Sequence, residues 1–475
     1  MTSHVSVVCL LVLFCSTSAD AAAPSSDTFR VSGFGAVTIY QPAGPPDQVV
    51  LFVSGDGGWN LGVVAMADQL RRLGALVVGI DIRAFLTALD AAPTCAYPAG
   101  ALEELSRAVQ RRYKLPRYHR PVLVGYSSGA TLVYAAIASA PAESFAGAIS
   151  LGFCADLEIH GRLCEMRGLK ATRKSKGVGY DLAPYRAMTT PWMVLQGDVD
   201  HVCAAEATRT FTTETGMARL FSLPKVGHGF GVPTRWEPQL VDAYRAIIDT
   251  TPSRSTAMPT TPIAGSPDRV DDLDLVEVPV TGGTPSGTMA VILTGDGGWA
   301  ELDKEVAAHL AANGVPTVGW SSLDYYWTPR SPAQAAEALG RVLDHYTRAW
   351  SALRVIVVGY SFGADVAPFL VNRLSDALKR HVVEVALLGP SDAASFEFHV
   401  AGWLGVGAGP QLLTLPEIAR LTTPVLCVTA EGDDDSPCAR ATQPRMRTVS
   451  IGAGHHFSGR YLQVAQAILA AEPAR

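Results

Sequence analysis

Apolar runs of strand length alternate with stretches of helical period along most of the chain. Strands that are apolar throughout are typical of sheets buried on both faces, and intervening helices imply parallel pairing. Each half of the chain therefore predicts a mostly parallel sheet covered by helices on both faces. The predicted strands lie at 49–53, 76–80, 122–124, 289–293, 317–320 and 355–358, and the predicted helices at 63–73, 102–113, 302–312 and 333–350.

A polar segment divides this pattern in two. Residues 250–268 are rich in Pro, Ser and Thr and have no apolar period, which is typical of a linker. At 475 residues the chain is also too long for one ordinary core. We therefore expect an N-terminal domain at 24–249 and a C-terminal domain at 269–475.

The N-terminus predicts a signal peptide at 1–23. The apolar run 5–14 is followed by small residues that offer two A-x-A cleavage sites, although no Lys or Arg precedes the run. The run is too short to span a membrane, and Phe14 is too bulky before Cys15 for a lipoprotein signal. We therefore expect export from the cytoplasm.

Composition and charge narrow the class of protein. Hydrophobic residues make up 48% of the chain and charged residues 17%, which suits a packed α/β enzyme and excludes disorder over most of its length. The formal net charge of −6 provides no general attraction to nucleic acid or to an anionic membrane. No nucleic-acid partner is expected.

The cysteines predict disulfides. Six remain after the signal peptide, and an even number in an exported chain favours pairing over buried free thiols. Cys427 and Cys438 are the only two in the second half and are the expected pair, whereas the four in the first half allow three connectivities. Without a C-x-x-C motif or a His-rich cluster, no metal and no cofactor are expected.

Two motifs occur twice, in the same order. The segment 51–59 recurs without gaps as 291–299, and each copy is followed by Gly-x-Ser-x-Gly, centred on Ser127 and on Ser361. Between an apolar strand and a helix, Gly-x-Ser-x-Gly is the nucleophile elbow of α/β-hydrolases, whose glycines permit the tight turn. The alternative is a Gly-rich packing turn. The repeat predicts a tandem pair of α/β-hydrolase-like domains.

An acid and a base follow each serine in the order that this fold uses. Gly-x-x-Asp spacing after a later apolar strand selects Asp200 and Asp435, with Asp198 and Asp433 as fallback choices. Gly-His-x-Phe motifs then supply the histidines. The repeat alignment pairs His455, and not His456, with His228. The predicted catalytic residues are Ser127, Asp200 and His228 in the first half and Ser361, Asp435 and His455 in the second.

A serine hydrolase also needs two backbone N–H donors for the oxyanion. One donor follows the nucleophile, and the other comes from a loop after an earlier strand, here the repeated Gly-Asp-Gly-Gly-Trp. A phosphate-binding loop is disfavoured because no Lys-Ser/Thr follows. The predicted donors are Ser128 and Gly57 in the first half and Phe362 and Gly297 in the second.

Three segments of the second half are distinctive: 294–304, which contains Leu302-Asp303-Lys304; 322–327, which ends in Tyr325-Tyr326-Trp327; and 359–366 around Ser361. Together they resemble the VirJ/AcvB family of bacterial virulence proteins. The two-domain arrangement, with a divergent copy ahead of the VirJ-like domain, resembles the AcvB branch of this family. The resemblance implies a periplasmic serine esterase acting on aminoacyl-phosphatidylglycerol, with lysyl-phosphatidylglycerol as the leading substrate. It also links such proteins to type IV secretion.

This resemblance gives Ser361, rather than Ser127, the lipid substrate, because the first half lacks the distinctive segments. The implied partner is an aminoacylated phospholipid at the membrane surface. A dicationic lysyl group should meet carboxylates. Further candidates, for each of which surface solvation is the alternative explanation, are Asp303, Asp324, Asp392 and Glu397. The expected substrate contacts are Asp296, Trp299, Tyr325, Tyr326 and Trp327.

Two rival functions stay open. One is a non-catalytic periplasmic binding or chaperone protein that assists secretion and has secretion-system proteins as partners. The other is a lipase or peptidase of different specificity with the same catalytic residues, because this fold hosts many chemistries.

Overall fold

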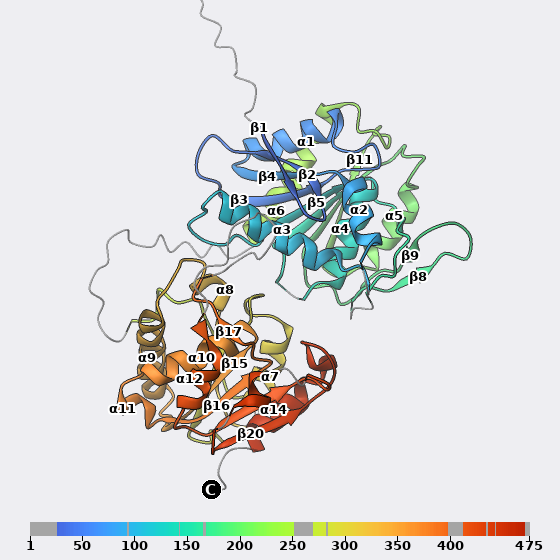
Figure 1. Ribbon diagram of the computed structural model, residues 1–475. Helices are drawn as coiled ribbons and strands as arrows, with labels where there is room; N and C mark the ends of the chain where they lie inside the picture. Colours follow the sequence, from blue (N-terminus) through green and yellow to red (C-terminus); the bar gives the residue numbers. More distant parts are fainter. Residues whose placement is uncertain are drawn as a thin grey trace, which may run out of the picture.

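The protein folds into two separate large sheets, one in each half of the chain (Figure 1). The predicted signal peptide at 1–23 and all but the first residue of the predicted linker at 250–268 lie outside the described residues. The computed structural model describes residues 26–92, 95–141, 143–164, 168–250, 269–281, 284–397, 412–433, 436–441 and 443–470.

The first sheet has eight strands in the order β1-β2-β4-β3-β5-β6-β10-β11. All neighbours from β4 to β11 pair in parallel, while β1 and β2 are antiparallel additions at one edge. The central strands are buried along their whole length, as their apolar sequences predict. The strands are β1 (Ser26–Val31), β2 (Gly35–Tyr40), β3 (Gln48–Val53), β4 (Ala75–Ile80), β5 (Val122–Tyr126), β6 (Gly147–Leu151), β10 (Trp192–Gly197) and β11 (Ala218–Leu223).

Helices cover both faces of this sheet. One face packs against α1 and α6, and the other against α2, α3, α4 and α5. Three short strands form a separate small sheet. The helices are α1 (Leu61–Arg72), α2 (Ile82–Asp90), α3 (Pro98–Arg112), α4 (Ser128–Ser139), α5 (Ala205–Thr213) and α6 (Glu237–Thr250), and the short strands are β7 (Asp156–Leu157), β8 (Ala171–Arg173) and β9 (Tyr180–Leu182).

The second sheet repeats this design with seven strands in the order β12-β14-β13-β15-β16-β19-β20. Only β12 is antiparallel to its neighbour. Helices α7 and α14 cover one face, and α9, α10 and α12 the other. The strands are β12 (Leu275–Val278), β13 (Thr288–Leu293), β14 (Thr317–Trp320), β15 (Arg354–Tyr360), β16 (Val382–Leu388), β19 (Val425–Thr429) and β20 (Met446–Ser450), and the helices are α7 (Glu301–Ala312), α9 (Pro332–Ala349), α10 (Phe362–Arg373), α12 (Thr414–Arg420) and α14 (Tyr461–Ala470).

Short elements complete this half. Helix α8 lies between β14 and α9, and a two-stranded sheet of β17 and β18 lies beyond β16. The prediction of two tandem α/β-hydrolase-like domains is confirmed as a fold. The short elements are α8 (Ser322–Tyr325), α11 (Asp376–Lys379), α13 (Pro437–Arg440), β17 (Ala393–Ala394) and β18 (Leu412–Leu413).

All six cysteines of the described halves are paired. Cys427 and Cys438 form the expected disulfide, and the first half pairs Cys95 with Cys164 and Cys154 with Cys203. Disulfides persist in oxidising compartments, so their presence fits a secreted or periplasmic protein. Among the described helices, none has the length and apolar character that a membrane crossing requires.

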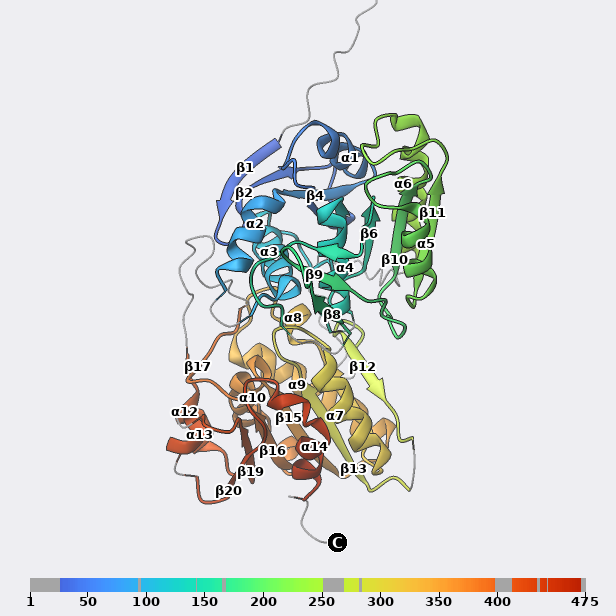
Figure 2. The ribbon, with the colours of Figure 1, turned by 90° about the vertical axis from the view of Figure 1, so that its right-hand side faces the viewer.

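The two halves face each other through α3 and the segment after it in the first half, and α8 and the segment after it in the second (Figures 1 and 2). Trp327 is the central contact. Its side chain is 4% exposed, and its indole N–H donates a hydrogen bond to the backbone oxygen of Leu115, 2.8 Å away. We call the contacts between residues 98–120 and 143–144 of the first half and residues 296–327 and Glu397 of the second half the junction.

Candidate active sites

Both predicted nucleophiles sit on a strained turn between a strand and a helix. Ser127 joins β5 to α4 with φ of 55°, and Ser361 joins β15 to α10 with φ of 53°. A Cβ on Gly129 would lie 2.3 Å from the oxygen of Val53, and one on Gly363 would lie 2.0 Å from the oxygen of Leu293. The glycines are therefore required so that the helix can approach the neighbouring strand.

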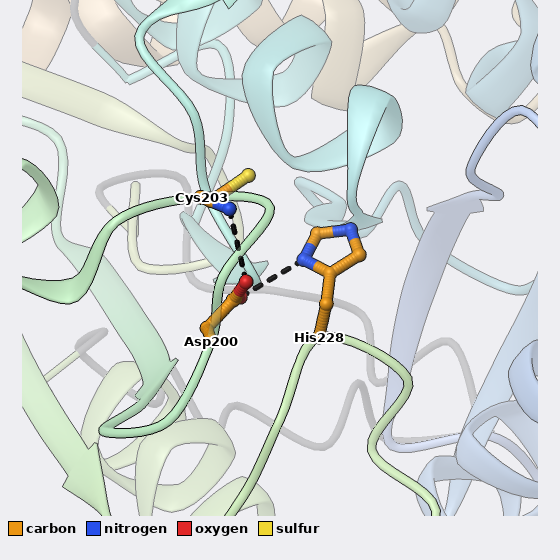
Figure 3. A group of neighbouring side chains, drawn as sticks. All are labelled: Asp200, Cys203 and His228. Atoms are coloured by element: carbon orange, nitrogen blue, oxygen red, sulfur yellow. Dashed lines mark hydrogen bonds and ion pairs between the residues drawn. The ribbon is translucent and has the colours of Figure 1, made fainter.

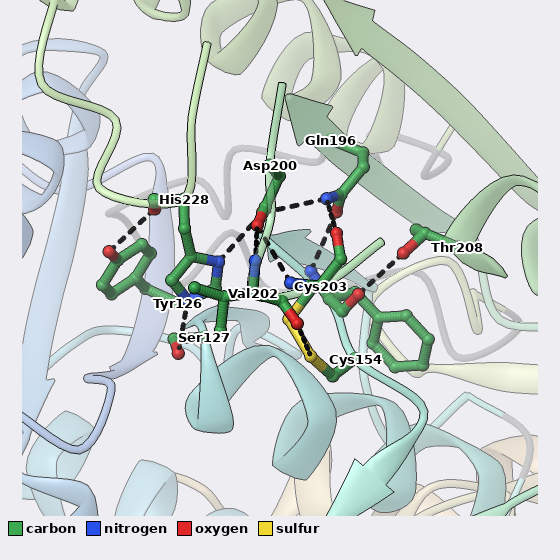
Figure 4. Close-up of polar contacts among 10 residues, drawn as sticks. Tyr126, Ser127, Cys154, Gln196, Asp200, Val202, Cys203, Thr208 and His228 are labelled. Carbon is green, nitrogen blue, oxygen red and sulfur yellow. Dashed lines mark hydrogen bonds and ion pairs between the residues drawn. A yellow bond between two sulfur atoms is a disulfide. The ribbon is translucent and has the colours of Figure 1, made fainter. Parts of the chain in front are cut away.

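The structure brings the three predicted catalytic residues of the first half together (Figure 4). Ser127 Oγ lies 2.9 Å from Nε2 of His228, and Nδ1 of the same ring lies 2.9 Å from Oδ2 of Asp200. They follow β5, β11 and β10 respectively, so the carboxyl ends of three parallel strands position them. The order of contacts is that of a Ser-His-Asp triad.

Asp200 is a buried carboxylate whose oxygens are well satisfied. It accepts hydrogen bonds from the backbone N–H groups of Val202 and Cys203, both at 2.9 Å, and from the side-chain amide of Gln196 at 3.0 Å. These donors hold the carboxylate in place beside the imidazole of His228. Asp198, the fallback choice, is exposed and accepts only from the backbone N–H of Lys225 among the hydrogen bonds described.

In the second half, His455 Nε2 lies 2.7 Å from Ser361 Oγ. The predicted acid, Asp435, lies outside the described residues, and the fallback Asp433 is exposed. His456 does not take the place of His455: its Nδ1 lies 3.1 Å from the hydroxyl of Tyr360. Burial, together with the neighbouring His455, lowers the pKa of His456.

The predicted oxyanion donors border each nucleophile. Ser128 and Phe362 are the first residues of α4 and α10 and directly follow the nucleophiles, which is the position of the first oxyanion donor in this fold. The loops that contain Gly57 and Gly297 lie beside the serines, since a Cβ on Gly55 or on Gly295 would be 3.0 Å or 3.5 Å from the serine Cβ. Each loop is a turn closed by a backbone hydrogen bond. The N–H of Gly58 donates to the oxygen of Gly55 at 2.9 Å, and the N–H of Gly298 donates to the oxygen of Gly295 at 3.2 Å.

The tryptophan that ends each loop packs flat on the sheet. A Cβ on Gly79 would lie 2.2 Å from the ring of Trp59, and one on Gly319 would lie 2.1 Å from the ring of Trp299. The glycine in the adjacent strand therefore makes room for the indole. This packing gives Trp299 a structural role, and its predicted contact with substrate stays a prediction.

The other expected substrate contacts differ in exposure. Asp296 is 60% exposed, whereas Tyr325 is partly buried and its hydroxyl donates to the oxygen of Gln334. Tyr326 and Trp327 are buried, the first with its ring 5.0 Å from that of Phe362 and the second at the junction. Of these residues, Asp296 alone presents most of its side chain to solvent, and all five contacts stay predictions.

The side chains of Asp200, Cys203 and His228 lie close enough to resemble a metal site (Figure 3). The sulfur of Cys203, however, is bonded to Cys154, and the carboxylate and imidazole are already paired with each other. A thiolate is the form that binds metal. The group is better explained as a catalytic acid and base held beside a disulfide.

Sequence reasoning missed two groups that support these sites. Gln196 is a polar residue inside the apolar strand β10, which is a signal that could have pointed to a buried partner such as Asp200. Arg107 is on α3 of the first half but donates to Asp296 in the oxyanion loop of the second half. A contact between residues so distant in sequence leaves no local signal.

Among solved structures, several α/β hydrolases resemble about half of the chain. Est1E from Butyrivibrio proteoclasticus is 14% identical with a TM-score of 0.32, and covers 47% of this chain and 99% of its own. The esterase domain of a Rhodothermus marinus protein is 18% identical with a TM-score of 0.33, covering 48% and 98%. An α/β serine hydrolase without a lid from Xanthomonas campestris is 21% identical with a TM-score of 0.31, covering 48% and 94%.

A comparison with curated proteins finds no match. The family model described as "Bacterial virulence protein (VirJ)" matches residues 47–160 and 287–475, which is more than half of the chain and includes both nucleophile elbows and both oxyanion loops. The chain belongs to the VirJ family of bacterial virulence proteins.

Proposed function

We propose that this protein is a periplasmic serine esterase that hydrolyses the aminoacyl ester of aminoacyl-phosphatidylglycerol, with lysyl-phosphatidylglycerol as the leading substrate. The observation that carries the proposal is the serine–histidine hydrogen bond at a strained elbow, present in both halves at 2.9 Å and 2.7 Å. A strained nucleophile held against a base, beside a Gly-rich turn, is suited to acyl transfer.

The same serine, histidine and backbone N–H groups serve both steps of the reaction, the formation of the acyl-enzyme and its hydrolysis. Histidine takes the proton of the serine hydroxyl while Oγ attacks the ester carbonyl, and backbone N–H groups stabilise the oxyanion. The C–O bond to the glycerol then breaks, and histidine returns the proton to that oxygen. Water repeats the sequence on the acyl-enzyme, which releases the free amino acid and regenerates the serine.

Two features support an aminoacyl lipid as the substrate of the second site. The carboxylate of Asp296 is on the loop next to Ser361, and although it contacts Arg107 at 3.3 Å it is 60% exposed and can attract the cationic amino groups of a lysyl ester. The three distinctive segments also lie within the longer of the two family matches, residues 287–475. The disulfides support a periplasmic location, where this lipid is accessible.

The test measures release of free lysine from lysyl-phosphatidylglycerol in mixed micelles, with alanyl-phosphatidylglycerol in parallel. We expect Ser361→Ala to abolish release and Ser127→Ala to retain most of it, because the second half is proposed to bind the lipid. Circular dichroism confirms folding of each variant. Unchanged release in the Ser361→Ala, Ser127→Ala double variant would exclude both serines as nucleophiles.

The same assay addresses the rival function. A folded wild-type protein that binds these micelles and releases no amino acid from either lipid would favour a non-catalytic periplasmic binding protein. If Ser127→Ala abolishes release while Ser361→Ala does not, the esterase stands but the assignment of the lipid to the second site is wrong.

A further inference from the structure

The oxyanion loop of the second half is held by a residue of the first half. Arg107, on α3, donates from Nη1 to the backbone oxygen of Asp296 at 3.2 Å and to its carboxylate at 3.3 Å. The Arg107 side chain is only 12% exposed, and its other face approaches Glu103 at 3.6 Å. Burial opposes the charge of the guanidinium, but Glu103 and Asp296 raise the pKa of Arg107 above its usual value, so it is cationic when it makes these contacts.

The bonded oxygen belongs to the peptide unit that supplies the proposed oxyanion donor. The oxygen of Asp296 and the N–H of Gly297 are two ends of one planar group and point in opposite directions. Fixing the oxygen therefore fixes the direction of the N–H. A cationic donor on the oxygen also polarises the peptide, which makes its N–H a better donor to an oxyanion.

This peptide is the part of the loop that most needs fixing. Gly295 to Gly298 form a hydrogen-bonded turn, and Asp296–Gly297 is its central peptide. The two common forms of such a turn differ by a flip of the central peptide, and the flipped form needs positive φ at the third residue. Gly297 does not have positive φ in the structure, but as a glycine it could adopt it readily.

The first half fixes its own loop in a different way. Asn60 donates from its side-chain amide to the oxygen of Gly57 at 2.8 Å, within the same loop and one peptide beyond the one that corresponds to Asp296–Gly297. The gapless repeat places Ala300 at the corresponding position of the second half, and alanine has no donor to offer. The second loop thus lacks the internal brace of the first and has Arg107 beside it.

We propose that the first half completes the second active site, with Arg107 as a positioning residue that holds the Asp296–Gly297 peptide in the orientation needed for the oxyanion. This inference rests on the proposed esterase function. It gives the first half a role in lipid hydrolysis that does not depend on Ser127. A small pocket beside the loop is lined from both halves, including Arg107, Tyr118 and Gly297, which places the first half at the edge of the second site.

The test uses the full-length protein with Ser127→Ala, so that only Ser361 contributes to release of lysine. If this parent releases no lysine, the proposed function fails at the second site before Arg107 is examined. If it does, we expect Arg107→Gln to lower kcat and kcat/KM together by about tenfold or more, because removal of a whole oxyanion donor costs about a hundredfold to a thousandfold. Affinity for a boronic acid that mimics the tetrahedral intermediate should fall in parallel.

A matched control separates positioning from general damage to the junction. Lys304→Gln removes another ion pair across the junction, with Glu143 at 3.3 Å, but does not touch the loop peptide. We expect its kcat to stay within about twofold of the parent, because the loop keeps its contacts with Arg107. Unchanged kcat in Arg107→Gln, an equal loss in Lys304→Gln, or a change in KM alone would overturn the proposal.

If Arg107→Gln does not fold, Arg107→Lys replaces it, since lysine keeps a cationic donor but lacks the rigid planar guanidinium that contacts both Asp296 and Glu103. We then expect a smaller but measurable fall in kcat and in boronic-acid affinity. No fall in either quantity would contradict a role for the guanidinium.

Discussion

At the scale of single residues, similar sequence signals lead to different surroundings. Asp200 and Asp303 are both buried acids, but Asp200 accepts three hydrogen bonds in addition to the one from His228, whereas Asp303 accepts one described bond, from the backbone N–H of Ala300 at 3.1 Å. Its other oxygen has no partner among the described residues. Asp303 was a sequence candidate for contact with a cationic substrate, and this expectation is wrong because its side chain is fully buried in the first turn of α7.

The buried acid predicts a pH-dependent stability. Burial raises the pKa of Asp303 to about 7 from its ordinary value of 3.8. Between these two pH values the folded state therefore retains a proton that the unfolded state releases. The contribution of protonated Asp303 to the free energy of unfolding is present below about pH 4 and is lost as the pH rises to 7. We expect Asp303→Asn to gain stability relative to wild type over that range, by up to about 4 kcal/mol, since one pKa unit corresponds to about 1.4 kcal/mol.

Urea unfolding of both proteins at pH 4, 5.5 and 7 measures this difference. The direction of the change is the informative part. The free energy of unfolding of Asp303→Asn should increase relative to that of wild type with each step upward in pH. A difference in free energy of unfolding that stays constant from pH 4 to 7 would show that Asp303 ionises normally in the folded protein.

At the scale of elements, periodicity located the parts that carry chemistry. The predicted helix at 302–312 is α7 with one more residue at its start, and the predicted helix at 333–350 is α9 displaced by one residue. Strands β1, β2 and β12 were missed because they lie at or next to a sheet edge, where exposed and partly buried residues replace the continuous apolar run. The elbows could be predicted because their glycines are required by local contacts, within one strand–turn–helix unit and with the adjacent strand.

Two glycines of the first half provide a test of that local demand. Gly129→Ala would place a Cβ against the backbone oxygen of Val53, which cannot move without disturbing β3. We expect a loss of about 3 kcal/mol or more in the free energy of unfolding, together with loss of reaction of Ser127 with a fluorophosphonate. Gly62→Ala, in α1, meets open space and should stabilise by up to about 1 kcal/mol. Equal effects of the two substitutions would contradict the close approach at the elbow.

At the scale of the whole molecule, the repeat was visible in the sequence but the junction was not. The triad of the first half could be predicted because order along the chain fixes which strand end carries each group. The contacts of Trp327 could not: it was expected to meet substrate, yet Leu115 and Tyr118 of the other half surround it. Arg111 lies over the same indole at 4.6 Å. An aromatic residue in a loop looks the same in sequence whether it faces a ligand or another domain.

Trp327→Ala distinguishes these two roles. Its ring is buried between the halves, and the residue is neither a nucleophile nor a base. Its loss should therefore loosen the junction and move α3, with Arg107, away from the second oxyanion loop. We expect a larger radius of gyration in X-ray scattering and a fall of about tenfold in Ser361-dependent kcat, with folding of each half retained. Trp350→Ala is the matched control, because Trp350 packs on Tyr346 within the second half, away from the junction, and should leave the radius unchanged. If Trp327 instead contacts the lipid, its substitution would raise KM at an unchanged radius of gyration. That outcome would show that Trp327 does not hold the two halves together, and Arg107 would have to reach the second oxyanion loop without it.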